Sequence, residues 1–234
     1  MTKEEFINEL KKINIEITKE QLNSLDKYYN LLIEKNKVMN LTAITKEEDV
    51  YLKHFYDSLT LIKAIDLNKD LSLCDLGTGA GFPGIVLKII FPNLKITLVD
   101  SLEKRIKFLN EVIEILNLEN IKTYHKRIEE FSKENKELYD VVVSRAVAKT
   151  NVLLELGCQL VKVNGFMILM KAEIEAEIKQ SENAIKTLNY TLENIVSFTL
   201  PKEESKRNII ILKKLKSTNN KYPREFGKIK KMPL

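Results

Sequence analysis

The chain has 234 residues, of which 44% are hydrophobic and 30% are charged, and its net charge is +5. This balance is typical of a soluble globular protein. No apolar run approaches the roughly 20 residues that cross a bilayer, and the N-terminus lacks the apolar core of a signal peptide. Cys74 and Cys158 lie in apolar runs without metal-ligand spacing. We therefore expect reduced core cysteines, no metal site and a cytoplasmic location.

Residues 1–66 are predicted to form a helical N-terminal extension. Capping-box patterns indicate three helix starts, at Thr2 with Glu5, Thr18 with Gln21 and Thr45 with Glu48. Apolar residues recur at helical spacing after the second and third of these starts. A turn is expected at Asn40-Leu41-Thr42, between the two helices. His54 and Asp57 lie three residues apart on the third helix, so they share one face. They form either a structural pair or a substrate-positioning pair.

From Leu71 onward, strands and helices alternate, which predicts a second domain over residues 67–216. Strands are expected at 71–75, 95–99, 121–125, 140–144, 166–171, 191–199 and 208–214. Helices are expected at 84–91, 103–117, 150–161 and 173–188. The interleaving predicts an α/β fold with a parallel sheet covered on both faces. The last two strands are too close in sequence for a covering helix, so they should pair antiparallel. A seven-stranded, Rossmann-like sheet ending in this way is typical of class I methyltransferases.

A glycine-rich turn follows the first predicted strand, in the stretch from Asp75 to Gly84. Glycines permit backbone conformations that a side chain blocks, and they let a ligand approach a helix N-terminus. Gly79, Gly81 and Gly84 match the fingerprint of dinucleotide folds. Gly77, Gly79 and Gly81 after an acidic residue instead match S-adenosylmethionine (SAM) enzymes. A carboxylate suits the cationic groups of SAM and repels a diphosphate. The motif and the antiparallel strand pair therefore favour SAM over a nicotinamide cofactor.

Polar residues also follow the next three strands, at the sheet edge where ligands of open α/β sheets bind. Asp100 can accept hydrogen bonds from ribose hydroxyls, provided that Ser101 caps the next helix instead. Glu129 follows the third strand, where an acid commonly lies at the adenine edge. It could also be an exposed residue at a helix start. Arg145 follows the fourth strand and is expected to contact ligand.

The residues after the fourth strand also limit the methyl acceptor. Ser144-Arg145-Ala146 replaces the motif that usually accompanies methylation of exocyclic base amines. Neither cysteine is placed as the nucleophile that pyrimidine carbon-5 usually needs. A ring nitrogen such as guanine N7 has an in-plane lone pair and needs no base. That acceptor fits the chain, and a ribose 2′-hydroxyl acceptor stays open.

Positive charge is concentrated at the C-terminal end of the chain. Residues 213–234 contain eight Lys and Arg against one acid, Glu225, which gives +7 and leaves −2 for residues 1–212. Such a basic tail, assigned here to residues 217–234, either contacts a polyanion such as nucleic acid or is merely solvated.

With these residues in order, the chain resembles the RsmG (GidB) family of bacterial ribosomal RNA methyltransferases over about residues 20–234. The marks are distributed along the chain: Asn40 to Ala43, His54 with Asp57 to Leu59, Gly77 to Gly84, Asp100-Ser101, Lys104-Arg105, Arg127 with Glu129, Ser144 to Ala146, Lys171, Arg207, Lys221 to Arg224 and Lys230 to Leu234. Each motif is ambiguous alone, whereas the ordered set is specific.

The resemblance implies methylation of N7 of one guanine in 16S rRNA, near the decoding region, with S-adenosylhomocysteine as the other product. It implies cofactor contacts at Gly77, Phe82, Asp100, Ile128, Glu129 and Arg145. The glycine motif adds Asp75, Gly79 and Gly81 to the expected cofactor residues, and Ser101, beside Asp100, is also expected among them. Position 128 is Ile where the family usually has Ala. Substrate positioning is expected from Asn40, His54, Asp57, Arg145, Lys171 and Arg207.

The same resemblance implies 16S rRNA or an assembling small ribosomal subunit as partner. RNA contacts are expected at Lys213, Lys214, Lys221, Tyr222, Arg224, Lys230 and Lys231, through phosphates and a stacked base. It also implies a cytoplasmic monomer without a membrane contact, whose loss gives low-level streptomycin resistance. An oxidoreductase with the same loop, or an RNA-binding protein without catalysis, are the alternatives.

Overall fold

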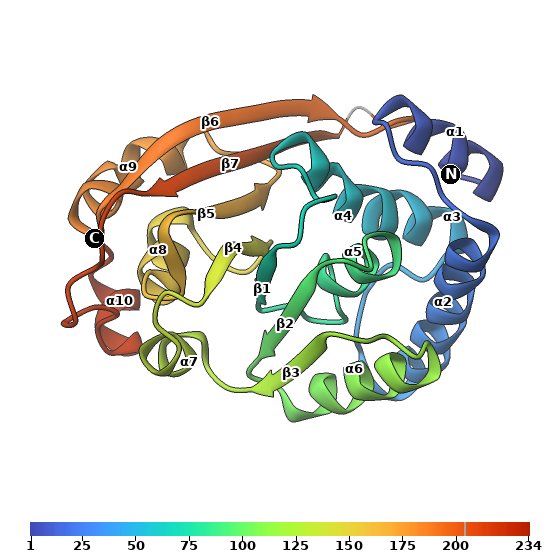
Figure 1. The fold of residues 1–234 in the computed structure, drawn as a ribbon, viewed down its shortest axis with the longest axis horizontal. Helices are drawn as coiled ribbons and strands as arrows, with labels where there is room; N and C mark the ends of the chain where they lie inside the picture. Colours follow the sequence, from blue (N-terminus) through green and yellow to red (C-terminus); the bar gives the residue numbers. More distant parts are fainter. Residues whose placement is uncertain (204) are drawn as a thin grey trace.

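The protein is described here by a computed structural model that covers residues 1–203 and 205–234. Within these residues seven strands form one sheet, in the order β3-β2-β1-β4-β5-β7-β6 (Figure 1). The strands are β1 Ser72–Leu76, β2 Lys95–Asp100, β3 Ile121–His125, β4 Tyr139–Arg145, β5 Val161–Lys171, β6 Tyr190–Thr199 and β7 Lys206–Lys214. The seven-stranded class I methyltransferase arrangement predicted from the sequence is thus confirmed.

Helices cover both faces of this sheet. Those before β1 are α1 Lys3–Lys12, α2 Lys19–Met39, α3 Glu47–Val50, the π-helix η1 Tyr51–Tyr56, α4 Asp57–Leu59 and the 3-10 helix η2 Thr60–Lys63. The later ones are α5 Gly84–Ile90, α6 Glu103–Ile115, α7 Ile128–Glu134, α8 Thr150–Gly157, α9 Glu175–Thr187 and α10 Phe226–Lys231.

Alternation along the strands divides the core into two clusters, one on each side of the sheet. In β4, Val141 and Val143 pack with the N-terminal helices, α5 and α6, whereas Val142 packs with α7, α8 and α9. Figure 1 shows these two groups of helices on opposite sides of the sheet. The N-terminal extension therefore shares a core with the sheet: Phe6 and Phe55 belong to the same cluster as Ile85. The three-part division of the chain made from the sequence stays a prediction.

The last strands are antiparallel, as predicted, because β7 inserts between β5 and β6 and runs against both. β5 is longer than expected, since it begins at Val161. The helix predicted over 150–161 ends at Gly157. A Cβ at Gly157 would lie 2.8 Å from the Leu76 side chain and 2.9 Å from that of Met167, so a larger residue at this end of α8 would require these two side chains to move. The remaining predicted boundaries differ from the observed ones by a few residues.

Helix capping agrees with the sequence at two of three positions. Thr2 with Glu5 and Thr18 with Gln21 form complete capping boxes. The third prediction is wrong, because α3 begins after Lys46, which makes no side-chain cap. The short helices α7 and α10 were not expected, since six or seven residues show little periodicity.

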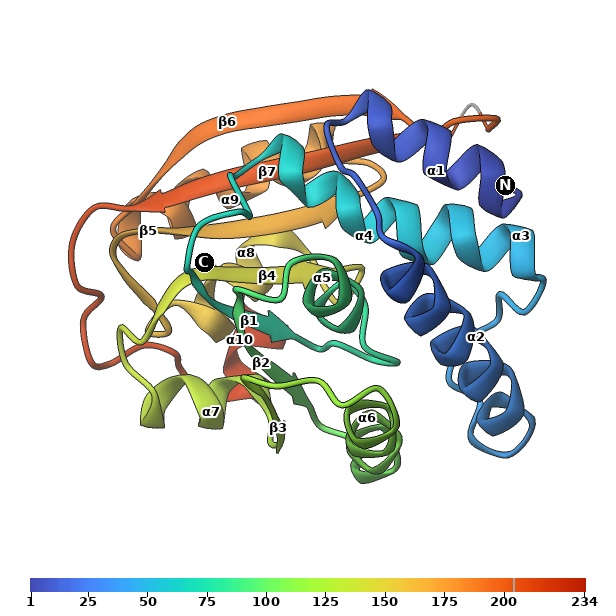
Figure 2. The ribbon, with the colours of Figure 1, turned by 45° about the vertical axis from the view of Figure 1, so that its right-hand side comes forward.

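The two terminal segments lie at opposite ends of the molecule. Figure 2 shows α1 to α4 stacked along one end, with α10 beneath the sheet near α7. No helix in the described ranges is long and apolar enough to span a membrane.

Candidate functional site

A cavity of about 790 Å³ opens beyond the carboxyl ends of β1, β2, β3 and β4. Its size is within the range of small-molecule and cofactor sites. The sheet edge forms its floor, and both terminal segments contribute walls. The lining residues are Leu41, Thr42, His54, Gly77 to Ala80, Phe82, Asp100, Ser101, Arg105, Arg127 to Glu129, Arg145 to Lys149, Val152, Leu156, Phe226, Lys230 and Pro233.

The glycine turn forms one side of the cavity and requires glycine for two reasons. Gly77 and Gly79 both have positive φ, +66° and +63°, which L-residues rarely adopt. A Cβ at Gly77 would also lie 2.6 Å from the Val147 side chain, which lines the same cavity. The turn is fixed by Gly77 N–H donating to the Val99 carbonyl at 2.9 Å. The turn thus forms a fixed backbone cradle directly after the carboxyl end of β1.

Two predicted cofactor residues do not line the cavity. Asp75 is fully buried beneath the turn, where Oδ2 accepts hydrogen bonds from Thr78 Oγ1 at 2.6 Å and Gly84 N–H at 2.9 Å. It therefore supports the turn and does not face a cationic ligand, contrary to the sequence analysis. Gly81 is packed against Tyr28 and Ile85, and its positive φ shapes the turn. Burial raises the pKa of Asp75 to about 6.

Asp100 lines the cavity at the end of β2, but it is not free of other bonds. Its Oδ2 accepts from Gly79 N–H at 2.9 Å and from Arg105 at 3.1 Å, and its Oδ1 accepts from Leu102 N–H. Asp100 itself thus binds the chain at the start of α6, and the predicted cap by Ser101 is wrong. Oδ1 keeps one lone pair for a ligand. The carboxylate links the glycine turn to the next strand.

Glu129 lies in the first turn of α7 and is only 7% exposed. The alternative of an exposed helix-start residue is therefore wrong. Its Oε1 accepts from Arg127 Nε at 2.6 Å, so both side chains are held at the cavity wall. Ile128 lies between them and lines the same wall. An acid at this place leaves a second carboxylate oxygen for a ligand.

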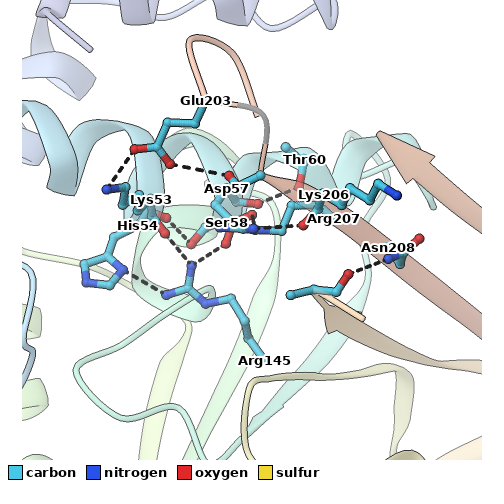
Figure 3. Close-up of polar contacts among 12 residues, drawn as sticks. Lys53, His54, Asp57, Ser58, Thr60, Arg145, Glu203, Lys206, Arg207 and Asn208 are labelled. Atoms are coloured by element: carbon cyan, nitrogen blue, oxygen red, sulfur yellow. Dashed lines mark hydrogen bonds and ion pairs between the residues drawn. The ribbon is translucent and has the colours of Figure 1, made fainter. Parts of the chain in front are cut away.

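A cluster of polar and charged side chains lies at the opposite end of the cavity. We call its four members, His54, Asp57, Arg145 and Arg207, the acceptor cluster. Figure 3 shows Arg145 reaching from β4 to both His54 and Asp57. Asp57 is 5% exposed and accepts from Arg145 Nη1 at 2.9 Å and Arg207 Nε at 3.1 Å. One buried carboxylate thus holds two arginines from strands that are distant in the sequence. His54 and Arg145 line the cavity, whereas Asp57 and Arg207 lie behind them.

The protonation of His54 follows from its neighbours. Arg145 Nη2 lies 3.3 Å from Nδ1 and can only donate, so Nδ1 accepts and the proton resides on Nε2. Nε2 donates to Thr42 Oγ1 at 2.8 Å. Burial and the charge of Arg145 lower the pKa of His54 to about 3, so the ring is neutral at physiological pH. It stacks on Phe82 with ring centroids 4.4 Å apart.

Thr42 is a cavity residue that the sequence analysis did not single out. Its Oγ1 accepts from His54 Nε2 and from Ile44 N–H at 3.0 Å. Both lone pairs are then used, and the hydroxyl proton has no acceptor among residues 1–203 and 205–234. Because Thr42 lines the cavity, its hydroxyl proton is available to a ligand bound there. Its place in the expected turn at 40–42 was the one available signal.

Two further substrate-positioning candidates lie outside the cavity. Asn40 is the left-handed C-cap of α2, which directs the chain into the turn at Leu41 and Thr42. Lys171 donates to Glu177 and to the Ala148 carbonyl, at 2.7 and 2.5 Å. Because Ala148 lines the cavity, Lys171 contacts the site only through the loop after β4.

The C-terminal residues differ most from the sequence prediction, because they are folded and not a free tail. Lys214 is fully buried and donates to the carbonyls of Cys158 and Val161. Tyr222 is 8% exposed within the second core cluster. Arg224 binds the buried Glu155 through Nε and Nη2, both at 2.6 Å. These three residues are therefore corrected from RNA contacts to structural residues. Lys221, Lys230 and Lys231 are exposed, and Lys213 is partly so.

Comparison with known proteins agrees with this geometry. Residues 21–210 match the family model GidB, described as rRNA small subunit methyltransferase G. The chain is 47% identical to Ribosomal RNA small subunit methyltransferase G of Bacillus subtilis strain 168, over all of this chain and 99% of that protein. It is 46% identical to the protein of the same name from Listeria monocytogenes, with both chains fully covered. The chain belongs to the GidB family. The resemblance drawn from the ordered motifs is confirmed, and the protein is a methyltransferase.

Solved structures show the same fold at low sequence identity. M. jannaschii TYW2, in complex with AdoMet, has a TM-score of 0.53 at 17% identity, covering 67% of this chain and 74% of that one. The YcgJ protein from Bacillus subtilis has a TM-score of 0.55 at 11% identity, covering 70% of this chain and 100% of that one. The shared part is the class I methyltransferase sheet with its helices.

Proposed function

We propose that this methyltransferase transfers a methyl group from SAM to N7 of one guanine in the decoding region of 16S rRNA and releases S-adenosylhomocysteine. The observation that carries the proposal is one cavity, at the strand ends of a GidB-family fold, between a glycine cradle and the acceptor cluster.

The lining residues fit the donor. Gly77 and Gly79 offer close approach to the backbone, and Asp100 Oδ1 keeps a lone pair for a ribose hydroxyl. Glu129 and the apolar Ile128 suit an adenine, whose amine can donate to the free carboxylate oxygen. Bound SAM supplies a methyl group on a positively charged sulfur. The residues need only align it with the acceptor, because the displacement is in line.

The acceptor cluster suits a ring nitrogen. Guanine N7 already has a lone pair in the ring plane, so no proton has to be removed. His54 is neutral: its Nδ1 accepts from Arg145, and its Nε2–H donates to Thr42. Both ring nitrogens are thus engaged, and the ring has no free lone pair to act as a base. His54 and Phe82 present a stacked aromatic wall that can hold a base. The guanine must leave its own stack to reach this wall.

RNA binding is proposed for the accessible cations, Lys213, Lys221, Lys230 and Lys231, which can meet phosphates without reading sequence. Asn40, Lys171 and Arg207 are proposed to position the site indirectly, through the turn at 40–42, the loop after β4 and Asp57. We also propose that the enzyme acts as a cytoplasmic monomer on 16S rRNA or the assembling small subunit.

Methylation of RNA from a strain lacking the gene tests the function. Labelled SAM should transfer label to 16S rRNA or small subunits, and mass spectrometry should map it to one guanine. An otherwise equal RNA with 7-deazaguanosine at that position has no N7 to accept the methyl group. Equal labelling of the two RNAs would exclude N7, and a methyl group on ribose would establish the alternative acceptor.

A further inference from the structure

The C-terminal segment, residues 218–234, is fixed to the methyltransferase fold by buried polar contacts. Gln159 donates to the carbonyls of Thr218, Asn219 and Tyr222. Glu155 has no exposed surface, and it accepts from Arg224 through the backbone N–H as well as the guanidinium. Truncating one member of such a buried pair leaves the other uncompensated, so the segment is held firmly against α8.

This anchoring brings three residues of the segment to the cavity: Phe226, Lys230 and Pro233. The Arg127 guanidinium lies over the Phe226 ring, 4.4 Å from its centroid, while Arg127 Nε binds Glu129. Phe226 is thereby joined to Glu129, the acid in the first turn of α7. The arrangement continues the wall that α7 begins, with a segment about 100 residues later in the sequence.

The wall has the chemistry of a site for a flat aromatic ring. Phe226 and Val147 are both exposed apolar side chains, at 36% and 40%, and both line the cavity. A ligand that covers them removes apolar surface from water, and an aromatic ring gains further from the face or edge of Phe226. Glu129 provides an acceptor beside it for an exocyclic amine.

We propose that the C-terminal segment is part of the cofactor site and that Phe226, held by Arg127, contacts the adenine of SAM. This inference rests on the proposed use of SAM and extends it to a segment that charge alone assigned to RNA. The same short helix carries the exposed Lys228 and Lys231. One element then serves cofactor and RNA together.

Calorimetric titration of the full chain with S-adenosylhomocysteine tests the proposal. Phe226→Ala should weaken binding roughly 3- to 10-fold, the size of an aromatic contact. Met232→Ala is the matched control, because Met232 lies in the same segment, is 66% exposed and is not a lining residue. It should bind as the unchanged protein does. Equal affinity of all three proteins would overturn the proposal. Absence of binding by the unchanged protein would instead overturn the use of SAM.

Two further measurements address the ligand's orientation and the fold of the variant. Adenosine should lose affinity for Phe226→Ala by the same factor as S-adenosylhomocysteine, since both carry adenine. A loss confined to S-adenosylhomocysteine would place Phe226 at the amino-acid end and contradict the proposal. In the unchanged protein, S-adenosylhomocysteine should slow hydrogen exchange over residues 226–232. Unaltered exchange there would count against the contact without any substitution.

Discussion

The two ends of the cavity each depend on one buried carboxylate, and they hold it in opposite ways. At the acceptor cluster, Asp57 faces two arginines. Beneath the glycine turn, Asp75 meets only neutral donors, Thr78 and Gly84, and in the described part of the chain its Oδ1 has no hydrogen-bond partner. The charges of Arg145 and Arg207 stabilise the Asp57 carboxylate, whereas burial disfavours the charged form of Asp75.

This difference separates two tasks. The acceptor cluster joins η1, β4 and β7, which are far apart in sequence, and a shared charge can link them over long side chains. The glycine turn is local, so short hydrogen bonds from its own residues are enough to fix it. A neutral Asp75 would serve the turn equally well, because its role is to accept from neighbours. Replacing each carboxylate by its amide compares the two directly.

The largest effect is expected from Asp57→Asn. The amide removes the charge that Arg145 and Arg207 share, and its NH₂ group faces an arginine donor. Breaking a buried ion pair on one side costs about 3 to 5 kcal/mol of unfolding free energy. The rate of methyl transfer should fall by more than the lost stability explains, because Arg145 would no longer hold His54. Urea unfolding and initial rates measure both effects.

The control for this change is Asp49→Asn, which breaks a half-exposed pair with Lys53. Solvent screens such pairs, so this change should cost far less stability than Asp57→Asn. Equal losses of stability in the two variants would show that Asp57 contributes no more to the fold than a half-exposed carboxylate, and would contradict its role in holding Arg145 and Arg207.

A smaller and pH-dependent effect is expected from Asp75→Asn. The pKa of Asp75 is about 6 in the fold against an ordinary 3.8. Between these values the folded protein keeps a proton that the unfolded chain has lost. Stability therefore falls as pH rises from about 4 to 6 and is level above that. The Asp75→Asn variant lacks this loss of stability. Its unfolding free energy relative to that of the unchanged protein should therefore rise by roughly 3 kcal/mol at most between about pH 4 and pH 6.

Urea unfolding at pH 4, 5, 6 and 7 measures that gain. Other titrating groups are common to both proteins and cancel in the difference. Parallel profiles for the two proteins would show that the pKa of Asp75 is not raised in the fold and would contradict the contrast between the two carboxylates.

A modest effect is expected from Thr42→Val, at the acceptor end. The change leaves His54 Nε2–H and Ile44 N–H without their acceptor, which costs about 1 kcal/mol or slightly more. It also removes the donor that faces the cavity. Thr42→Ser keeps the hydroxyl and should keep both stability and rate. Thermal unfolding and kcat/KM for the pair distinguish lost hydrogen bonding from a changed shape.

The last prediction concerns the charge of the His54 ring, which should not change in the folded protein within the physiological pH range. Its pKa of about 3 predicts a neutral ring from pH 5 to 8. Acid should charge the folded ring only well below the ordinary value. Stability should fall as pH drops from about 6.5 toward 3, because over that range the unfolded histidine takes up a proton and the folded one does not. Nuclear magnetic resonance of a His125→Gln variant follows the one remaining histidine. An inflection of its chemical shift near pH 6.5 would show that His54 has an ordinary pKa and would contradict the neutral ring.

The sequence predicted the parts of the site that depend on topology. Carboxyl ends of parallel strands meet at one edge, so Asp100, Glu129 and Arg145 could be placed together from their strands alone. The glycine turn was recognisable because its backbone needs glycine. The partners of buried charges were not predictable, since Glu155 and Arg224 are 69 residues apart and nothing local links them. Phe226 was missed for the same reason, because its contact with Arg127 joins distant parts of the chain. Asp75 was assigned to the ligand because the motif does not show that its side chain turns inward, to Thr78 and Gly84.

The walls of the cavity run from Leu41 to Pro233, so nearly the whole chain must fold before the cavity exists. Binding of the donor is then thermodynamically linked to global folding and not to one loop. Each tenfold rise of free ligand above its dissociation constant adds about 1.4 kcal/mol to the stability of the entire chain. The occupancy of the cavity would therefore contribute to the stability of the whole fold and not only to the rate of the reaction.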